Sequence, residues 1–503
     1  MNAPDWRSSN AADAILAARA HDERPALIDL MRTGADATSN AGVAVSYARL
    51  VELVEAATRE LRALGLARDG GEVPRVCLAG ANGTTYVVLA LAVLRAGACL
   101  VPLASELSHA EREQLVRAVH PRAVLLAPGA RWEGSVAPQR VLRVGGDEVG
   151  VVLAPCGDAR SPLDEARLAA LDPAFIRFSS GTTGASKGVV LSHRTLLERV
   201  AAANRGLGIT ADDRVLWVLS MAHHFAASIL LYLANGATTV LVGAQLPAEL
   251  LGAAREHAAT VLYASPFHYG SLAAVRAEGA WPSLRLAVST AASLPTTTAR
   301  AFEARFGVPP AQALGIIEVG IVALNRTPRE RPESIGRPLP DFAVELRDER
   351  GAVVAPGEIG ELFVRGPGML DAYLWPFRSR DEILQDGWFS TGDLATAAAD
   401  GSLTLVGRAR SVINVSGLKC FPEEIEAVLE RHPEVAAARV SGRPHAHVGA
   451  VPVADVVPRD PQRPPEPREL AAHCRASLAR FKVPVEFRFV DELPRTASGK
   501  VKR

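Results

Sequence analysis

Cysteine is scarce in this sequence of 503 residues, and aromatic residues make up only 5% of it. The cysteines number five, an odd count, and no two of them form a CxxC pair: Cys77, Cys99, Cys156, Cys420 and Cys474. This pattern argues against a disulfide framework and against a structural zinc site. We therefore expect the protein in a reducing compartment, the cytoplasm.

An excess of charge of either sign is also missing, because 55 basic residues balance 55 acidic ones. The balance gives no electrostatic reason to expect nucleic acid or an anionic membrane as a partner. The most apolar stretch, 86–94, is cut by Arg95, well short of the ~20 residues of a membrane helix. The first residues contain no basic segment leading into an apolar one, so we expect no secretory signal. We therefore expect a protein that has no transmembrane segment and acts on a small molecule.

Helical and strand-like patterns alternate through the first four hundred residues, and the length alone predicts two or more domains. Apolar residues spaced by three and four predict a helix that ends near Gly65, and "VPRVCLAG" and "CLVPL" are typical of buried strands around a second helix closed by Gly97. This alternation predicts an α/β protein built on a largely parallel sheet.

The pattern changes after residues 408–411, where we place a domain boundary. A short helix beginning at Pro422, a strand at 451–457 and a helix at 470–481 follow. The predicted domains are therefore 1–407 and 408–503.

A glycine-rich loop lies between two strand-like runs, "FIRF" and "GVVLS". It contains Ser179, Ser180, Gly181, Thr182, Thr183 and Gly184, followed by Lys187. Glycines let backbone N–H groups approach an anion and hydroxyls add donors, which favours a phosphate-binding loop over an ordinary turn. Ser186 stands where a Walker loop needs glycine, so this is a different phosphate loop.

The ordered string SSGTTGASKG resembles the phosphate loop of the adenylate-forming superfamily, which comprises acyl-CoA synthetases, adenylation domains of nonribosomal peptide synthetases and firefly luciferase. The resemblance extends over nearly the whole chain and implies a large multi-sheet N-terminal domain with a small mobile α+β C-terminal domain. It implies use of ATP and Mg²⁺ to convert a carboxylic acid to an acyl-adenylate, which then reacts with a thiol. Lys187 is implied as a contact of the departing phosphates, with an exposed loop lysine as the alternative.

Later motifs appear in the family's order. Asp393 in "STGDLA" is implied as the acceptor of the ribose hydroxyls, since a carboxylate offers two acceptors to a vicinal diol. Arg408 is implied as a second ribose contact and Arg410 as the hinge residue. In "LPRTASGKVKR", Lys500 is implied as the catalytic lysine. The segment 415–419, with Ser416, Gly417 and Lys419, is implied beside the thiol tunnel.

The segment "LGIIEVG" resembles the family's magnesium motif and places Glu318 as the metal ligand. The usual tyrosine and threonine are replaced by Leu314 and Ile317, and Ile316 also departs from the usual residue. Loss of an aromatic ring against adenine removes ~0.5–1.5 kcal/mol. The replacements predict weaker ATP binding but leave the metal ligand in place.

The acid pocket is implied around "MAHHFAASILLYL". His223 is the implied gating residue, although a histidine in an apolar run is also common as a core residue. The segment beginning at Phe225 resembles the peptide-synthetase Phe-Asp-x-Ser with Ala226 in place of aspartate, so a substrate ammonium would be buried unpaired. We expect a fatty or aryl acid rather than an α-amino acid, with Gly315 also near the substrate.

Two acceptors remain open, coenzyme A as the leading one and the phosphopantetheine arm of a separate acyl carrier protein as the alternative. A nucleotide-binding homologue with impaired catalysis is a third possibility, based on the altered Leu314–Ile317 stretch. The sequence does not indicate an oligomeric state.

Overall fold

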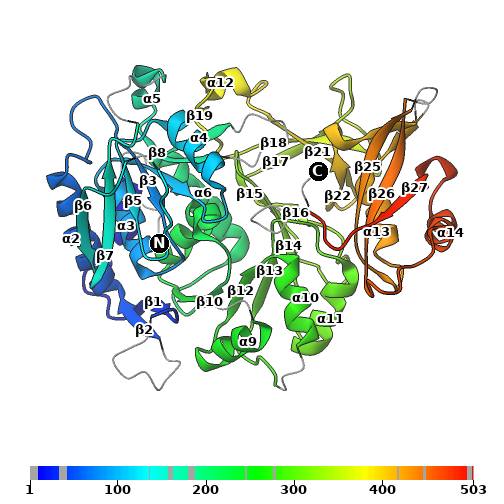
Figure 1. The fold of residues 1–503 in the computed structure, drawn as a ribbon, viewed down its shortest axis with the longest axis horizontal. Helices are drawn as coiled ribbons and strands as arrows, with labels where there is room; N and C mark the ends of the chain where they lie inside the picture. The colour runs from blue at the N-terminus through cyan, green and yellow to red at the C-terminus, as the bar shows by residue number, and fades with distance from the viewer. Residues whose placement is uncertain are drawn as a thin grey trace.

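The computed structural model describes residues 10–32, 42–134, 136–156, 163–178, 187–243, 246–275, 279–415, 418–445, 449–494 and 501. Its named strands form two nine-stranded sheets, a four-stranded sheet and a sheet of five strands. Figure 1 shows the two large sheets and their helices on the left and in the middle, and the C-terminal strands on the right.

The first large sheet consists of β1 (Pro25–Asp29), β2 (Val43–Ser46), β10 (Arg214–Trp217), β11 (Thr238–Leu241), β12 (Val261–Ala264), β13 (Leu286–Ser289), β14 (Ala311–Ile316), β15 (Gly320–Leu324) and β16 (Arg337–Pro338). Their order across the sheet is β16-β15-β14-β13-β12-β10-β11-β1-β2. Pairing is parallel from β14 to β1 and antiparallel at both edges. The sheet therefore presents the carboxyl ends of six strands at one edge.

The second large sheet consists of β3 (Arg75–Ala79), β4 (Cys99–Leu103), β5 (Ala123–Leu126), β6 (Arg140–Val144), β7 (Asp147–Leu153), β8 (Pro173–Phe178), β9 (Gly188–Ser192), β19 (Ala372–Tyr373) and β20 (Arg378–Ser379). Their order is β20-β19-β9-β8-β4-β3-β5-β7-β6. The central strands β5, β3, β4 and β8 are parallel, whereas β9 pairs antiparallel with β8. The pair β8 and β9 thus flanks the predicted phosphate loop.

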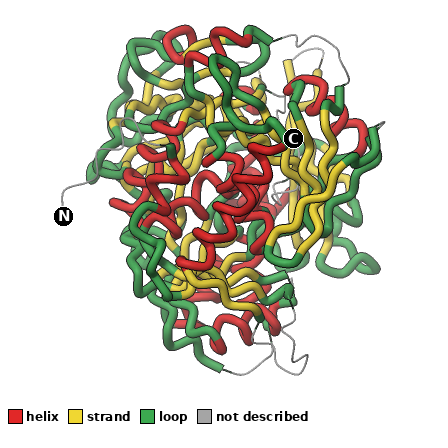
Figure 2. The backbone as a smooth tube through the Cα atoms, turned by 90° about the vertical axis from the view of Figure 1, so that its left-hand side faces the viewer, coloured by secondary structure: helices red, strands yellow, loops and turns green. Residues whose placement is uncertain are grey.

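The largest hydrophobic core lies between these two sheets. The residues of β10 alternate between the two faces of the first sheet. Val215 and Trp217 belong to this core, whereas Leu216 belongs to the core on the other face. The helices of this layer are α1 (Ala11–Leu16), α2 (Tyr47–Ala63), α3 (Thr84–Arg95), α6 (His193–Leu207) and α8 (Leu230–Ala234). Figure 2 shows helices gathered between the strands of the two sheets. α3 has eleven buried residues, which explains why its sequence is apolar all round.

Further helices cover the outer faces of the two sheets. α9 (Pro247–Glu256), α10 (Pro266–Ala274) and α11 (Thr296–Phe306) pack on the first sheet, and α4 (His109–Val119) and α5 (Glu165–Ala170) pack on the second. The result is five alternating layers of helix and sheet, in which both large sheets are covered on both faces.

The four-stranded sheet consists of β17 (Ala343–Arg347), β18 (Gly360–Arg365), β21 (Phe389–Ala397) and β22 (Leu403–Arg408), all antiparallel. The short helix α12 (Arg380–Ile383) precedes β21. A 3₁₀ helix at Ala409–Ser411 then connects β22 to the last sheet.

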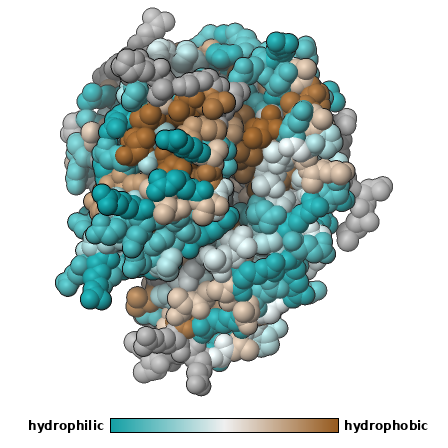
Figure 3. Space-filling view, turned by 90° about the vertical axis from the view of Figure 1, so that its right-hand side faces the viewer, coloured by the Kyte–Doolittle hydropathy of each residue, from teal (hydrophilic) through white to brown (hydrophobic). Residues whose placement is uncertain are grey.

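The last sheet consists of β23 (Ile413–Val415), β24 (Leu418–Cys420), β25 (Val435–His445), β26 (Gly449–Pro458) and β27 (Glu486–Phe489), and it carries α13 (Pro422–Leu429) and α14 (Pro467–Ser477). These elements enclose a hydrophobic core of their own. Figure 3 views the molecule from this side: polar residues cover most of the face, and hydrophobic residues gather in its upper half.

The predicted fold class, a large multi-sheet N-terminal part with a small α+β part, is confirmed. The predicted helices near Gly65 and Gly97 and both strands around the phosphate loop are also present. Two details differ. The helix expected at 470–481 begins at Pro467, where Glu466 and Glu469 form a capping box, and ends at Ser477 because Leu478 is extended. The largely parallel sheet expected from the alternation corresponds to two large sheets, each parallel at its centre and antiparallel towards its edges.

None of the helices in the described part of the chain combines the length and the apolar character needed to cross a membrane.

Candidate active site

Three of the predicted site segments follow the carboxyl ends of strands. β8 ends at Phe178, directly before the phosphate loop, His223 follows β10, and Glu318 follows β14. Ligands of open α/β sheets bind outside the carboxyl ends of the strands. The topology therefore brings these three segments to positions where a ligand is expected.

Glu318 and Lys187 meet at the side chain of Tyr373. The hydroxyl of Tyr373 donates to Oε1 of Glu318 at 3.1 Å, and Nζ of Lys187 lies 4.8 Å from the centre of the Tyr373 ring. Burial, followed by the charge of Glu318, raises the pKa of Tyr373 far above its usual value. The phenol therefore stays protonated and holds one oxygen of the Glu318 carboxylate.

Close packing around Gly188, the first residue of β9, explains why a glycine stands at this position. A Cβ there would lie 2.9 Å from Cβ of Leu374, closer than real Cβ contacts, and 3.0 Å from Cζ of Phe178, tighter than most of them. The side chain of Phe178 therefore points to the Leu374 side of β8, away from the core between the sheets. This close approach fixes β8 and β9 against β19.

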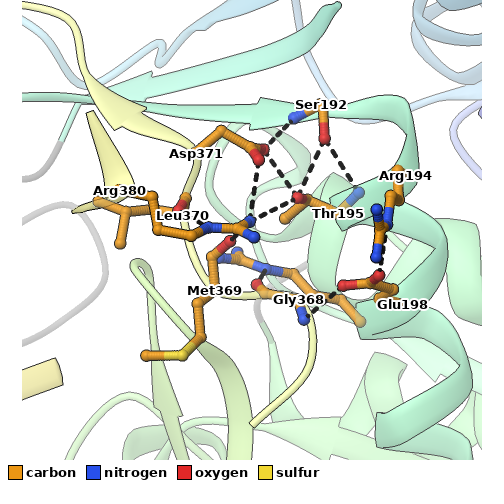
Figure 4. A network of polar contacts seen from close by, with 10 residues as sticks. Ser192, Arg194, Thr195, Glu198, Gly368, Met369, Leu370, Asp371 and Arg380 are labelled. Atoms are coloured by element: carbon orange, nitrogen blue, oxygen red, sulfur yellow. Dashed lines mark hydrogen bonds and ion pairs between the residues drawn. The ribbon is translucent and has the colours of Figure 1, made fainter. Parts of the chain in front are cut away.

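A polar network connects α6 to the segment that carries Tyr373 (Figure 4). One carboxylate oxygen of Asp371 accepts from Ser192 N at 2.6 Å and from Thr195 Oγ1 at 2.7 Å, and the other from Arg380 Nη2 at 2.9 Å. Arg380 also donates to the carbonyls of Met369 and Leu370. The network fixes the segment 368–371 two residues before Tyr373.

Arg199 of α6 ties the same segment to the strand end at Glu318. Its Nε donates to Gly368 O at 2.6 Å and its Nη1 to Ile317 O at 2.9 Å, while Leu370 N donates to Glu318 O at 2.7 Å. The backbone of Glu318 is therefore held from two sides, which restricts where its carboxylate can lie.

Asp371→Ala should destabilise the protein, because three donors lose their acceptor in a half-buried position. A buried donor left without a partner costs about 1–3 kcal/mol. We expect a lower melting temperature in scanning calorimetry than for the parent protein. The control is Asp381→Ala, at an exposed position of α12; equal melting temperatures for the two variants would contradict the role of the network.

Asp393 and Arg408, the predicted ribose contacts, lie opposite each other in the antiparallel pair of β21 and β22. Nε of Arg408 is 2.8 Å from Oδ1 of Asp393, and the Asp393 side chain is 10% exposed against 57% for Arg408. Asp393 N donates to Thr391 Oγ1 at 3.0 Å, which fixes the turn. A positioned carboxylate with an arginine beside it suits the predicted contact with a vicinal diol.

Asp393→Ala should therefore remove the discrimination between ATP and 2′-deoxy-ATP. In the parent enzyme the missing hydroxyl should raise the KM about tenfold, the effect of losing one charge-assisted hydrogen bond. In the variant both nucleotides should have the same, higher KM, while the KM of the acid is unchanged. Retained discrimination, measured by pyrophosphate release, would show that another group holds the ribose.

His223 lies in the short helix α7 (Met221–His224). Its Nε2 is 4.0 Å from Oε2 of Glu106, too far for a hydrogen bond. Burial lowers the pKa of His223 to about 4, and the positive charge of Arg177 contributes further. The imidazole is therefore neutral at neutral pH.

Phe225 and Ala226 begin a π-helical turn, Phe225–Ile229, that follows α7 directly after His224. Phe225 has no exposed surface and its ring packs edge-on against Tyr86, with centroids 6.3 Å apart. Ala226 is 8% exposed. Such turns are frequent at functional sites, and the substrate roles of both residues stay predictions.

The altered stretch before Glu318 runs along β14 and beyond its end. Leu314 is buried in the main core, Gly315 is exposed, and Ile316 and Ile317 are half-buried against the same core. The pairing of β14 with β15 shifts between Leu314 and Gly315. The weaker ATP binding expected from these replacements stays a prediction.

Several predicted residues lie outside the described part of the chain: Ser179, Ser180, Gly181, Thr182, Thr183, Gly184, Ser416, Gly417 and Lys500. For Lys419 only the backbone, in β24, is described. Arg410 is exposed in the 3₁₀ helix between β22 and β23. The roles of all of these residues stay predictions.

Four residues at or near the site were not predicted from the sequence: Arg177, Arg199, Asp371 and Tyr373. Tyr373 and Asp371 lie in "LDAYLW", which contains no motif that was used. Arg177 did offer a signal, since it is the one charged residue in the apolar strand "FIRF".

The comparisons with known proteins define the class. Residues 16–374 match the AMP-binding enzyme family and residues 424–500 match the AMP-binding enzyme C-terminal domain. The chain belongs to the AMP-binding enzyme family, and the resemblance to adenylate-forming enzymes is confirmed.

Its relatives include acid–CoA ligases. Feruloyl-CoA synthase of an Amycolatopsis species is 31% identical over 94% of this chain and 95% of its own. Indoleacetate–CoA ligase of Aromatoleum aromaticum is 30% identical over 91% of this chain and 92% of its own. The crystal structure of ATP-bound MatB from Rhodopseudomonas palustris is 26% identical, with a TM-score of 0.81 over 98% of this chain and 97% of that chain.

Proposed function

We propose that the protein is an AMP-forming acid–thiol ligase that converts a carboxylic acid to its coenzyme A thioester. The acid carboxylate attacks the α-phosphate of ATP, pyrophosphate leaves, and the thiol of coenzyme A then displaces AMP from the acyl-adenylate. The observation that carries the proposal is the position of Glu318, held by Tyr373 beside Lys187 at the end of β14. Full-length similarity to acid–CoA ligases supports it.

The residues present fit a magnesium ion brought in with ATP. No group of three His, Cys, Asp or Glu side chains that could hold a metal occurs among the described residues. Mg²⁺ in phosphoryl-transfer sites typically uses one or two carboxylates, with phosphates and water completing its shell. Glu318 would supply that carboxylate, and the bound ion would neutralise charge that develops on the phosphates.

The remaining roles follow from the resemblance and from the geometry. Lys187 and the loop Ser179–Gly184 would hold the phosphates, and Asp393 with Arg408 would hold the ribose. Lys500 would approach the α-phosphate during adenylation. We place the domains at 1–407 and 408–503, with Arg410 as the hinge, so that Ser416, Gly417 and Lys419 face the thiol in the second step.

For the acid, we propose a hydrophobic fatty or aryl compound without an α-ammonium group. Ala226 offers no carboxylate to such a group, and the surroundings in the π-helical turn are apolar. The aryl acids in the names of the relatives support the aryl class. We propose the cytoplasm as the compartment, consistent with five cysteines that are all free.

The acceptor can be determined by one experiment. Purified protein, ATP and Mg²⁺ are incubated with ferulate, indoleacetate, benzoate or decanoate, with either coenzyme A or a phosphopantetheine carrier protein. We expect acid-dependent pyrophosphate release and a CoA thioester detected by mass spectrometry. Acylation of the carrier alone would establish the carrier-loading alternative, and absence of pyrophosphate release with every acid would contradict the proposal.

A further inference from the structure

Arg177 is a half-buried arginine that no role assigned above uses. It is the last residue but one of β8, and Gly188 packs against the side chains of Ile176 and Phe178 on one face of that strand. Because side chains alternate along a strand, Arg177 points to the opposite face. That is the face of Phe175, which belongs to the core between the two large sheets.

The guanidinium of Arg177 makes no hydrogen bond or ion pair with the residues that the structure describes. Its Nε is shielded from solvent and has no acceptor. Burial lowers the pKa of Arg177 to about 10. Because this value is still well above neutral pH, the side chain is a cation there. A buried charge without a partner is strongly unfavourable, and buried cations are normally paired with an anion.

Arg177 interacts electrostatically with three residues of the candidate site. Glu318 attracts it, and its positive charge acts on His223 and on Arg199. None of the carboxylates described comes within ion-pair distance of it. His223 contributes a second unsatisfied group, since its Nε2 is also shielded and has no hydrogen-bond partner among the described residues.

We propose that Arg177 binds the carboxylate of the acid substrate and orients it toward the α-phosphate. This assignment rests on the proposed function. The reacting carboxylate must lie between the phosphates, which the metal at Glu318 would hold, and the acid pocket next to His223. Arg177 is within electrostatic reach of both residues and offers donors in a geometry that suits a carboxylate.

The test uses the full-length protein and the variants Arg177→Gln and Arg177→Lys. Pyrophosphate exchange is measured with the acid of the panel that gives the highest rate in the parent. We expect Arg177→Gln to raise the KM of the acid about tenfold to a hundredfold, the range for lost charge-assisted hydrogen bonds, with the KM of ATP unchanged. Arg177→Lys should recover part of the loss. Arg143→Gln, which removes an arginine whose side chain is 81% exposed, is the control.

A neutral analogue separates charge recognition from a structural role. The primary amide of the same acid is tested as a competitive inhibitor. Its inhibition constant should rise much less in Arg177→Gln than the KM of the acid does, because the amide oxygen accepts only a neutral hydrogen bond and carries no charge.

The outcomes are distinguishable. A raised KM for ATP instead of the acid would assign Arg177 to the phosphates, and equal losses for acid and amide would assign it to folding; both overturn the proposal. In another outcome, the parent exchanges pyrophosphate while Arg177→Gln keeps the parent's KM for the acid. This result would overturn only the assignment of Arg177. No exchange in the parent with every acid would overturn the proposed function and this inference with it.

Discussion

Lys500→Ala should lower the rate of acyl-adenylate formation by roughly a factor of 10²–10³ while leaving thioester formation from a supplied acyl-adenylate intact. During adenylation a carboxylate approaches a phosphate, so that an ammonium at the five-coordinate phosphorus stabilises the transition state. Removing one well-placed donor of this kind costs about 3–4 kcal/mol, or roughly a factor of 10²–10³ in rate. In the second step we expect the lysine to be withdrawn, so that its loss should change the rate little.

The two half-reactions are measured separately, by pyrophosphate exchange and by thioester formation from synthetic acyl-adenylate and coenzyme A. Lys502→Ala is the matched control, since it removes the same charge two residues further on. Exchange at the parent rate in Lys500→Ala would refute the assignment. Equal losses in both half-reactions would indicate that the lysine is needed for folding or for domain placement.

Glu318→Gln should lower the rate of adenylation about 100-fold, because it removes the carboxylate that would hold magnesium. The amide keeps the shape of the side chain and an oxygen for the Tyr373 hydroxyl, which donates at 3.1 Å in the structure. The charge is lost and one carboxylate oxygen becomes an amide NH2, whereas Mg²⁺ prefers charged oxygen ligands. Half-maximal activity should therefore need a higher Mg²⁺ concentration in the variant.

The measurement is a magnesium titration of pyrophosphate exchange at saturating acid. Glu330→Gln, at an exposed position beyond β15, should match the parent. Tyr373→Phe should lower the rate by less than Glu318→Gln, because it removes one hydrogen bond and leaves the carboxylate charged. An unchanged magnesium requirement in Glu318→Gln would show that another group holds the metal.

Local patterns in the sequence predicted individual elements well. The helix that ends at Ala63 was predicted because its apolar residues repeat at three and four, and they are buried in the structure. The order of the strands could not be predicted, since β1 pairs with β11, more than two hundred residues away. β25 was missed because its second half, from Ser441 to His445, is exposed and shows no apolar alternation.

In the candidate site, too, residues within local motifs were predicted and contacts between distant segments were not. Glu318, Asp393 and Arg408 were predicted because each lies in a motif of the family. Tyr373 could not be predicted, because it reaches Glu318 only through the pairing of β19 with β9. The absence of a partner for Arg177 among the described residues was equally hidden, since a sequence does not show which side chains meet.

Attack of the acid carboxylate on the α-phosphate of ATP can be followed with an isotope label. The enzyme is given ATP, coenzyme A and an acid that carries ¹⁸O in both carboxylate oxygens, and the products are analysed by mass spectrometry. Because the thiol displaces AMP at the acyl carbon, AMP should carry one ¹⁸O and pyrophosphate none. Unlabelled AMP, or label in pyrophosphate or phosphate, would contradict an acyl-adenylate.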